Sequence, residues 1–138
     1  MSNRTLTIVK PDAVAAGKAG AILAQLEKEG FRLLGMKRMR LAPEQARAFY
    51  SVHRERPFFE GLVRFMTEGP VLVVALERAD AVPHLRQTMG ATDSKKAEAG
   101  TIRHLHGTDI ERNAIHGSDS PENASKEIGF FFAESELL

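Results

Sequence analysis

The feature that most constrains the fold is a continuous apolar run of strand length, VLVVAL, at residues 71–76. A run of this length and composition predicts a strand that is buried on both faces. The β-branched, apolar segment from Thr5 to Lys10 predicts an earlier strand, which should end at Lys10 because Pro11 cannot donate to a ladder. An alternating pattern from Phe31 to Arg40 predicts a strand between these two.

Helical patterns separate and follow these strands. An apolar stripe opposite charged residues predicts an amphipathic helix that ends at Gly30. Ser120 as N-cap and Pro121 as first helical residue predict a helix to Phe131. Further helices are expected over residues 42–50, 58–69 and 81–89. The order strand, helix, strand, helices, strand, helix predicts a single α+β domain over residues 1–138.

Composition excludes several classes of protein. Nineteen Lys and Arg residues against eighteen Asp and Glu leave a net charge of +1, so nucleic acid is not an expected partner. The chain has no cysteine, which removes disulfides, thiolate metal sites and thiol nucleophiles. It shows no signal-peptide pattern and no apolar run of the ~20 residues that a membrane span needs. We therefore expect a cytoplasmic protein without a membrane partner.

Residues 90–117 show no regular period, and so long an unpatterned stretch in a compact domain suggests function. This segment and its borders hold polar side chains without an evident structural role: Arg86, Thr92, Arg103, Asn113, His116, Ser118 and Asp119. Arginines and a threonine on one loop could bind phosphate. His116 could act as a nucleophile, with Glu127 of the following helix holding its tautomer. Taken singly, each is explained more simply as a surface charge, a turn hydroxyl or a structural histidine.

The remaining histidines give weaker signals. The spacing of His104 and His106 could place two imidazoles on one strand face, but no cysteine or carboxylate frame supports a metal site there. His53 and His84 are expected at the surface. Neither G-x-x-x-x-G-K-[ST] nor a G-x-G-x-x-G after a strand occurs. The residues alone therefore predict a phosphate-binding loop and nothing more specific.

Five blocks of sequence nevertheless resemble a known family. They read RTLTIVKPDAV (4–14), ERPFF (55–59), MGAT (89–92), GTIR (100–103) and NAIHGSDS (113–120). In this order they are similar to the pattern of nucleoside diphosphate kinases, over essentially the whole chain. The resemblance implies a ferredoxin-like βαββαβ fold, a four-stranded antiparallel sheet with helices on its surface. It places the fourth strand near residues 130–132.

The resemblance also implies an activity. A nucleoside triphosphate such as ATP would phosphorylate His116, and the group would pass to a nucleoside diphosphate in a ping-pong, Mg²⁺-dependent reaction. Glu127 and Ser118 would orient the imidazole, and Asp119 would meet the metal through water. The matching positions for nucleotide contacts are Lys10, Tyr50, Phe58, Arg86, Thr92, Arg103 and Asn113, with Lys10 also counted among the catalytic residues. Phe58 would stack on the base, which explains broad base specificity, although without the resemblance it reads as a core aromatic beside Phe59.

Two departures and two rival functions remain. Ala99 stands where many members carry proline, which predicts lower stability or weaker oligomer packing. The chain ends at Leu138, as in short bacterial-type members, and a homo-oligomer, tetramer or hexamer, is expected. A phosphohistidine relay protein would share His116 but would not need Phe58, Tyr50 and Asn113 around it. A non-catalytic nucleotide- or nucleic-acid-binding scaffold is disfavoured by the near-zero net charge and by His116.

Overall fold

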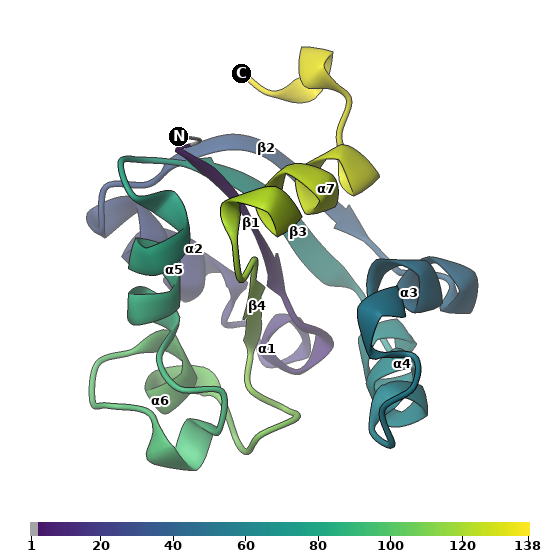
Figure 1. Ribbon diagram of the computed structural model, residues 1–138. Coiled ribbons are helices and arrows are strands. Elements are labelled where there is room, and N and C mark those ends of the chain that lie inside the picture. The colour runs from purple at the N-terminus through teal and green to yellow at the C-terminus, as the bar shows by residue number, and fades with distance from the viewer. Residues whose placement is uncertain (1–2) are drawn as a thin grey trace.

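The fold is built on a four-stranded antiparallel sheet, seen in a computed structural model that describes residues 3–138 (Figure 1). The strands are β1 (Arg4–Val9), β2 (Arg32–Met39), β3 (Val71–Glu77) and β4 (Ile115–Gly117). They lie in the order β2-β3-β1-β4, and every neighbouring pair is antiparallel. With the intervening helices this is the expected ferredoxin-like βαββαβ arrangement, which is therefore confirmed.

Seven α-helices connect and follow the strands. They are α1 (Pro11–Ala15), α2 (Ala19–Lys28), α3 (Pro43–Phe49), α4 (Phe59–Thr67), α5 (Ala81–Met89), α6 (Ile102–His106) and α7 (Pro121–Phe131) among residues 3–138. All five predicted helices, α2 to α5 and α7, are present. The N-cap prediction for α7 also holds, because Ser120 Oγ accepts the Asn123 N–H at 3.1 Å and Pro121 opens the helix.

Both faces of the sheet are covered, as the apolar run of β3 predicts. Val71, Val73 and Ala75 belong to a core shared with α3, α4 and α7. The alternate residues Val74 and Leu76 belong to a second core, shared with α1, α2, α5 and α6. Figure 1 shows α7 crossing the sheet beside β1, and α3 and α4 together at one end. A strand between two apolar layers has no polar face, so its sequence does not alternate.

The structure corrects two expectations. The fourth strand is not at residues 130–132, where α7 ends, but at Ile115–Gly117, where it pairs with β1. His104 and His106 lie in α6 and not on a strand, and residues two apart on a helix do not share a face. Residues 3–138 hold no cluster of three or more His, Cys, Asp or Glu side chains that could bind a metal.

Smaller differences concern single residues. β1 ends at Val9, one residue before the predicted Lys10, which instead precedes α1. His53 and His84 are half-buried and not fully exposed, and His84 Nε2 lies 2.9 Å from Glu29 Oε1. Within the described residues, no helix has the length and apolarity needed to cross a membrane.

Candidate active site

The short strand β4 determines where His116 points. Its pairing with β1 sets Ile115 opposite Val9 and His116 opposite Ile8, and Thr7 Oγ1 donates to the His116 carbonyl at 2.7 Å. Ile115 is buried in the core shared with α5. Because side chains alternate along a strand, the His116 imidazole points to the opposite face, toward α3 and α7.

On that face the imidazole is held by one carboxylate and two aromatic rings. Glu127 Oε1 lies 2.8 Å from His116 Nε2, and Ser118 Oγ donates to the same oxygen at 2.8 Å. The Phe49 and Tyr50 rings meet the imidazole edge-on, at centroid distances of 5.3 and 5.9 Å. A carboxylate at Nε2 favours the tautomer that is protonated there. Nδ1, which has no hydrogen-bond partner among residues 3–138, is then left with its lone pair free.

Two buried cationic side chains, Lys10 and Arg103, have lowered pKa values. Burial, with a contribution from Arg103, lowers the pKa of Lys10 from 10.5 to about 8. Burial and the charge of Arg86 lower the pKa of Arg103 to about 10. Both shifts mean that the folded protein disfavours these positive charges in the absence of a counter-ion. Cations arranged in this way form a site suited to a multiply charged anion such as a polyphosphate.

Hydrogen bonds fix these cations against the loop and β4. Arg103 donates from Nη1 to the Gly90 carbonyl at 3.2 Å and from Nη2 to the Ile115 carbonyl at 2.8 Å. The half-buried contact from Arg86 Nη1 to the Gly117 carbonyl measures 3.3 Å. Both arginines are therefore anchored on the residues that flank His116.

Lys10 is tied to the same loop from the other side. Its Nζ donates to Asn113 Oδ1 at 2.8 Å, and Asn113 Nδ2 donates to the Thr92 carbonyl at 2.9 Å. The Tyr50 hydroxyl is buried with no hydrogen-bond partner among residues 3–138, and burial raises its pKa. Arg103 interacts electrostatically with this hydroxyl.

Most of the predicted site residues therefore meet in one place, and two lie at its margin. Contacts or electrostatic interactions connect His116, Glu127, Ser118, Lys10, Tyr50, Arg86, Thr92, Arg103 and Asn113. Phe58 stands apart from this network, 49% exposed, with its ring 5.5 Å from that of His53. Its neighbour Phe59 is the core aromatic. Asp119 is exposed and accepts a hydrogen bond of 2.6 Å from Asn123 Nδ2.

Sequence reasoning missed three residues around His116. Phe49 packs on the imidazole, Thr7 binds its backbone, and Asp12 Oδ2 accepts the N–H of Ala114 at 3.1 Å. Asp12 lies two residues after Lys10 in the block at residues 4–14 that resembles the family, and this placement was the available signal for it. Phe49 and Thr7 read as ordinary helix and strand residues.

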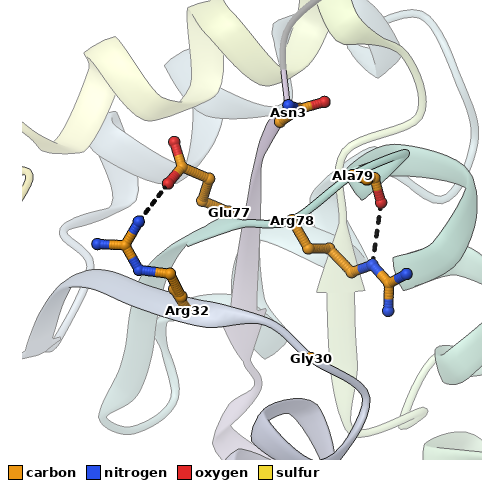
Figure 2. Close-up of a pocket in the computed structure, with 6 residues that line it drawn as sticks. All are labelled: Asn3, Gly30, Arg32, Glu77, Arg78 and Ala79. Atoms are coloured by element: carbon orange, nitrogen blue, oxygen red, sulfur yellow. Dashed lines mark hydrogen bonds and ion pairs between the residues drawn. The ribbon is translucent and has the colours of Figure 1, made fainter.

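Figure 2 shows a surface hollow of about 430 Å³ that is lined by Arg32, Glu77 and Arg78. It lies at the end of the sheet where Glu77 pairs with Arg4, whereas His116 pairs with Ile8 toward the other end of β1. The charged groups of the hollow are already paired. Arg32 Nη1 binds Glu77 Oε1 at 2.8 Å, while Arg78 donates from Nε to the Ala79 carbonyl at 2.9 Å and from Nη1 to the Glu29 carbonyl. With its cations bound to protein acceptors, this hollow is a poorer phosphate site than the cluster beside His116.

Comparison with known proteins agrees with this geometry. The family model of nucleoside diphosphate kinase matches residues 3–137. The nucleoside diphosphate kinase of Acidiphilium cryptum is 55% identical over 137 residues, 99% of this chain and 98% of that one. The Halorhodospira halophila enzyme of the same name is 54% identical over 134 residues, 97% of this chain and 95% of its own.

Solved structures give the same result. The Aquifex aeolicus nucleoside diphosphate kinase superposes with a TM-score of 0.97 at 48% identity, over the full length of both chains. The Halobacterium salinarum enzyme, solved in complex with CDP, gives a TM-score of 0.95 at 44% identity over all of this chain and 92% of that one. Fold, sequence and site together identify a nucleotide-binding phosphotransferase. More particularly, the chain belongs to the nucleoside diphosphate kinase family.

Proposed function

We propose that this kinase moves the γ-phosphoryl group of ATP to a nucleoside diphosphate in two steps, through a phosphohistidine on Nδ1 of His116. The observation that carries this proposal is the occupation of Nε2 by Glu127, which leaves Nδ1 free. In the first step an N–P bond forms at Nδ1 as the γ-phosphorus separates from the bridging oxygen, and ADP leaves. In the second step a nucleoside diphosphate oxygen attacks the same phosphorus and the N–P bond breaks. One neutral imidazole thus serves both half-reactions.

The surrounding groups act on the charges that develop. As Nδ1 attacks, the ring becomes positive, and Glu127 stabilises it while the proton stays on Nε2. Ser118 keeps this carboxylate in place by donating to the same oxygen. Arg86 and Arg103 stabilise negative charge on the phosphate oxygens, the main requirement for phosphoryl transfer, while Lys10 binds the nucleotide equally in the ground state and the transition state.

The nucleoside is bound with little reading of the base. The half-exposed ring of Phe58 offers a stacking surface, which is tolerant of base identity. Lys10 and Asn113 reach the ribose hydroxyls, while Tyr50 and Thr92 line the phosphate site. The CDP complex of the Halobacterium salinarum relative supports nucleotide binding at this fold. Broad base specificity follows from this arrangement.

The residues present fit a Mg²⁺ ion that arrives with the nucleotide. Mg²⁺ keeps several waters and is commonly bound by phosphates and one or two carboxylates. Asp119 is an exposed carboxylate directly after Ser118, and its Oδ1 is the atom bound to Asn123, so the other oxygen can meet a metal-bound water. When bound, the ion would neutralise charge on the phosphates.

The chain would act as a single domain over residues 1–138, in the cytoplasm, as a homo-oligomer. Exposed apolar side chains on α6 and in the segment after it support assembly, with Leu105 at 54% and Ile110 at 64% exposure. Analytical ultracentrifugation distinguishes a tetramer from a hexamer, and a monomer would contradict this part of the proposal.

One experiment tests the activity. The protein is incubated with γ-³²P-labelled ATP and Mg²⁺, separated from nucleotide, and then given GDP or CDP. An acid-labile label on the protein that passes to GTP or CTP is expected, and His116→Ala should abolish both. His84→Ala is the matched control, because it removes another half-buried histidine paired with a glutamate and should leave labelling intact.

The same assay separates the rival functions. A phosphohistidine relay protein would be labelled but would not pass the group to GDP or CDP. A non-catalytic nucleotide-binding scaffold would bind ATP without being labelled. Labelling that survives in His116→Ala would also refute the proposed mechanism.

A further inference from the structure

The backbone is strained at Ala114, directly before β4. Ala114 has a φ of +75°, in the left-handed region that residues with a Cβ seldom adopt. The N–H of Ile115 donates to the carbonyl of Asn113 at 2.9 Å, which makes Ala114 the centre of a γ-turn of the rarer, strained kind. Such a conformation persists only where the surrounding structure holds it.

The segment from Lys10 to Asp12 holds this turn at both polar groups of Ala114. The Ala114 N–H donates to Asp12 Oδ2 at 3.1 Å, and the Ala114 carbonyl accepts the Lys10 N–H at 2.8 Å. Asp12 lies in the first turn of α1, 102 residues away along the chain. Burial raises the pKa of Asp12, whereas hydrogen bonds from backbone N–H groups, that of Ala114 among them, lower it. The bond to Ala114 therefore stabilises a carboxylate that burial disfavours.

The turn connects two parts of the site that are held differently. On one side of the turn, Asn113 Oδ1 accepts a hydrogen bond of 2.8 Å from the Lys10 ammonium group. On the other side, His116 is fixed by its pairing with β1 and by Glu127, neither of which involves Ala114. Releasing the turn should therefore displace the Asn113–Lys10 pair more than the nucleophile.

We propose that Asp12 is a positioning residue for nucleotide binding, because its carboxylate holds the γ-turn at Ala114 and so keeps Asn113 and Lys10 in place. The inference rests on the proposed function, in which these two residues contact the nucleotide. It separates Asp12 from the groups that touch the reacting atoms. Its signature is a change in nucleotide affinity with little change in the rate at saturation.

The test measures the rate of His116 phosphorylation over a range of ATP concentrations, which gives a half-saturating concentration and a maximal rate. Asp12→Ala should raise the half-saturating concentration about tenfold, the order expected for a lost hydrogen bond to a charged group. Its maximal rate should stay within about threefold. Asp12→Asn keeps an oxygen acceptor for the Ala114 N–H and should rescue the affinity. Glu136→Ala is the control, since it removes a carboxylate bound to a backbone N–H at 2.7 Å in the C-terminal turn.

A second substitution tests whether Asp12 acts through the turn. Glycine adopts positive φ readily, so in Ala114→Gly the turn depends less on the carboxylate. In this background Asp12→Ala should shift the half-saturating concentration by no more than about threefold, a coupling that a double-mutant cycle measures. If Asp12→Ala does not fold alone, the half-saturating ATP concentration of the double variant is compared with that of Ala114→Gly, and the two should differ by no more than about threefold.

Three outcomes overturn the inference. They are an unchanged half-saturating concentration in Asp12→Ala, a lower maximal rate with unchanged affinity, and an equal shift in the Ala114→Gly background. Failure of the proposed function looks different, because the wild type would then carry no label. If the wild type carries no label, calorimetric titration with ADP measures the nucleotide affinity of the same variants, because binding of ADP needs no phosphoryl transfer.

Discussion

Lys10 places a charge inside the protein, and its replacement by methionine should stabilise the fold while impairing nucleotide binding. The residue is 7% exposed, and its ammonium group donates to one acceptor among residues 3–138, Asn113 Oδ1. Burial, reinforced by Arg103, lowers its pKa from 10.5 to about 8. A pKa difference of this size corresponds to about 3 kcal/mol of destabilisation at neutral pH.

Methionine recovers part of this free energy. Its unbranched side chain has a similar length and fills the same space near the Phe65 ring, which lies 5.8 Å from the Lys10 ammonium. The substitution leaves Asn113 Oδ1 without its donor, which costs about 1–2 kcal/mol. The net gain is then about 1–2 kcal/mol, or about 3–7 °C in Tm for a domain of this size.

The gain depends on pH, and its sign follows from the lowered pKa. Below pH 8 Lys10 is charged in both states, and the full destabilisation is present. Between pH 8 and 10.5 the unfolded chain binds a proton that the folded protein has released, so the wild-type free energy of unfolding rises with pH. Above pH 10.5 Lys10 is neutral in both states. The advantage of Lys10→Met should therefore be largest at pH 7 and fall toward pH 10.5.

Urea denaturation at pH 7, 8.5 and 10 measures this difference, at one subunit concentration so that assembly contributes equally. Lys96→Met is the matched control, because Lys96 is exposed and its replacement should change stability by less than about 0.5 kcal/mol. A wild type more stable than Lys10→Met at pH 7, or a difference that does not change up to pH 10, would refute the reasoning. The half-saturating ATP concentration should rise in Lys10→Met and not in Lys96→Met.

Three further substitutions test other parts of the structure. Gly117→Ala places a Cβ 2.5 Å from Met89 Sδ in a closed core, so it should lower the free energy of unfolding by about 1–3 kcal/mol; unchanged urea denaturation would contradict this packing. Ala99 and Gly100 are the two central residues of a turn in which the Thr101 N–H donates to the Glu98 carbonyl at 3.2 Å, and Gly100 has a φ of +89°. Proline fits the first central position of such a turn, so Ala99→Pro should raise the free energy of unfolding by about 0.4–1 kcal/mol with kcat unchanged. A melting curve without stabilisation would count against this prediction. Ser118→Ala removes one hydrogen bond to Glu127 and should lower the maximal phosphorylation rate about tenfold with little change in KM, and a selective rise in KM would exclude its role in orienting His116.

Local sequence patterns predicted the larger elements because each of them repeats its pattern over several residues. The apolar run at residues 71–76 and the capped helix after Ser120 are examples, and both are present. β4 could not be found in this way, because three residues, of which one is a large apolar side chain, show no period. It exists because Ile115 pairs with Val9, more than 100 residues earlier. α6 is similarly short, and Thr101 Oγ1, which accepts the His104 N–H at 3.3 Å, begins it.

The residues of the site were likewise predictable in part, whereas the contacts between them were not. Residue types on the long loop were enough to suggest a phosphate site, and the family resemblance supplied a role for each side chain. The contacts that arrange them were not predictable, because they depend on the register of β4 and on the conformation of Ala114. Alanine carries no signal for positive φ, which sequence rules assign to glycine, asparagine or aspartate.

These departures from local rules are concentrated around His116, and their position has a physical meaning. Lys10 and Arg103 are buried cations whose pKa values are lowered by burial and by a neighbouring cation, Ala114 has a strained backbone, and the Tyr50 hydroxyl is buried without a partner among residues 3–138. Each lowers the stability of the protein, and a nucleotide polyphosphate would offset the largest of them by neutralising the cations. Nucleotide binding should therefore offset the destabilisation that these groups cause, and nucleotide should stabilise the wild type more than it stabilises Lys10→Met.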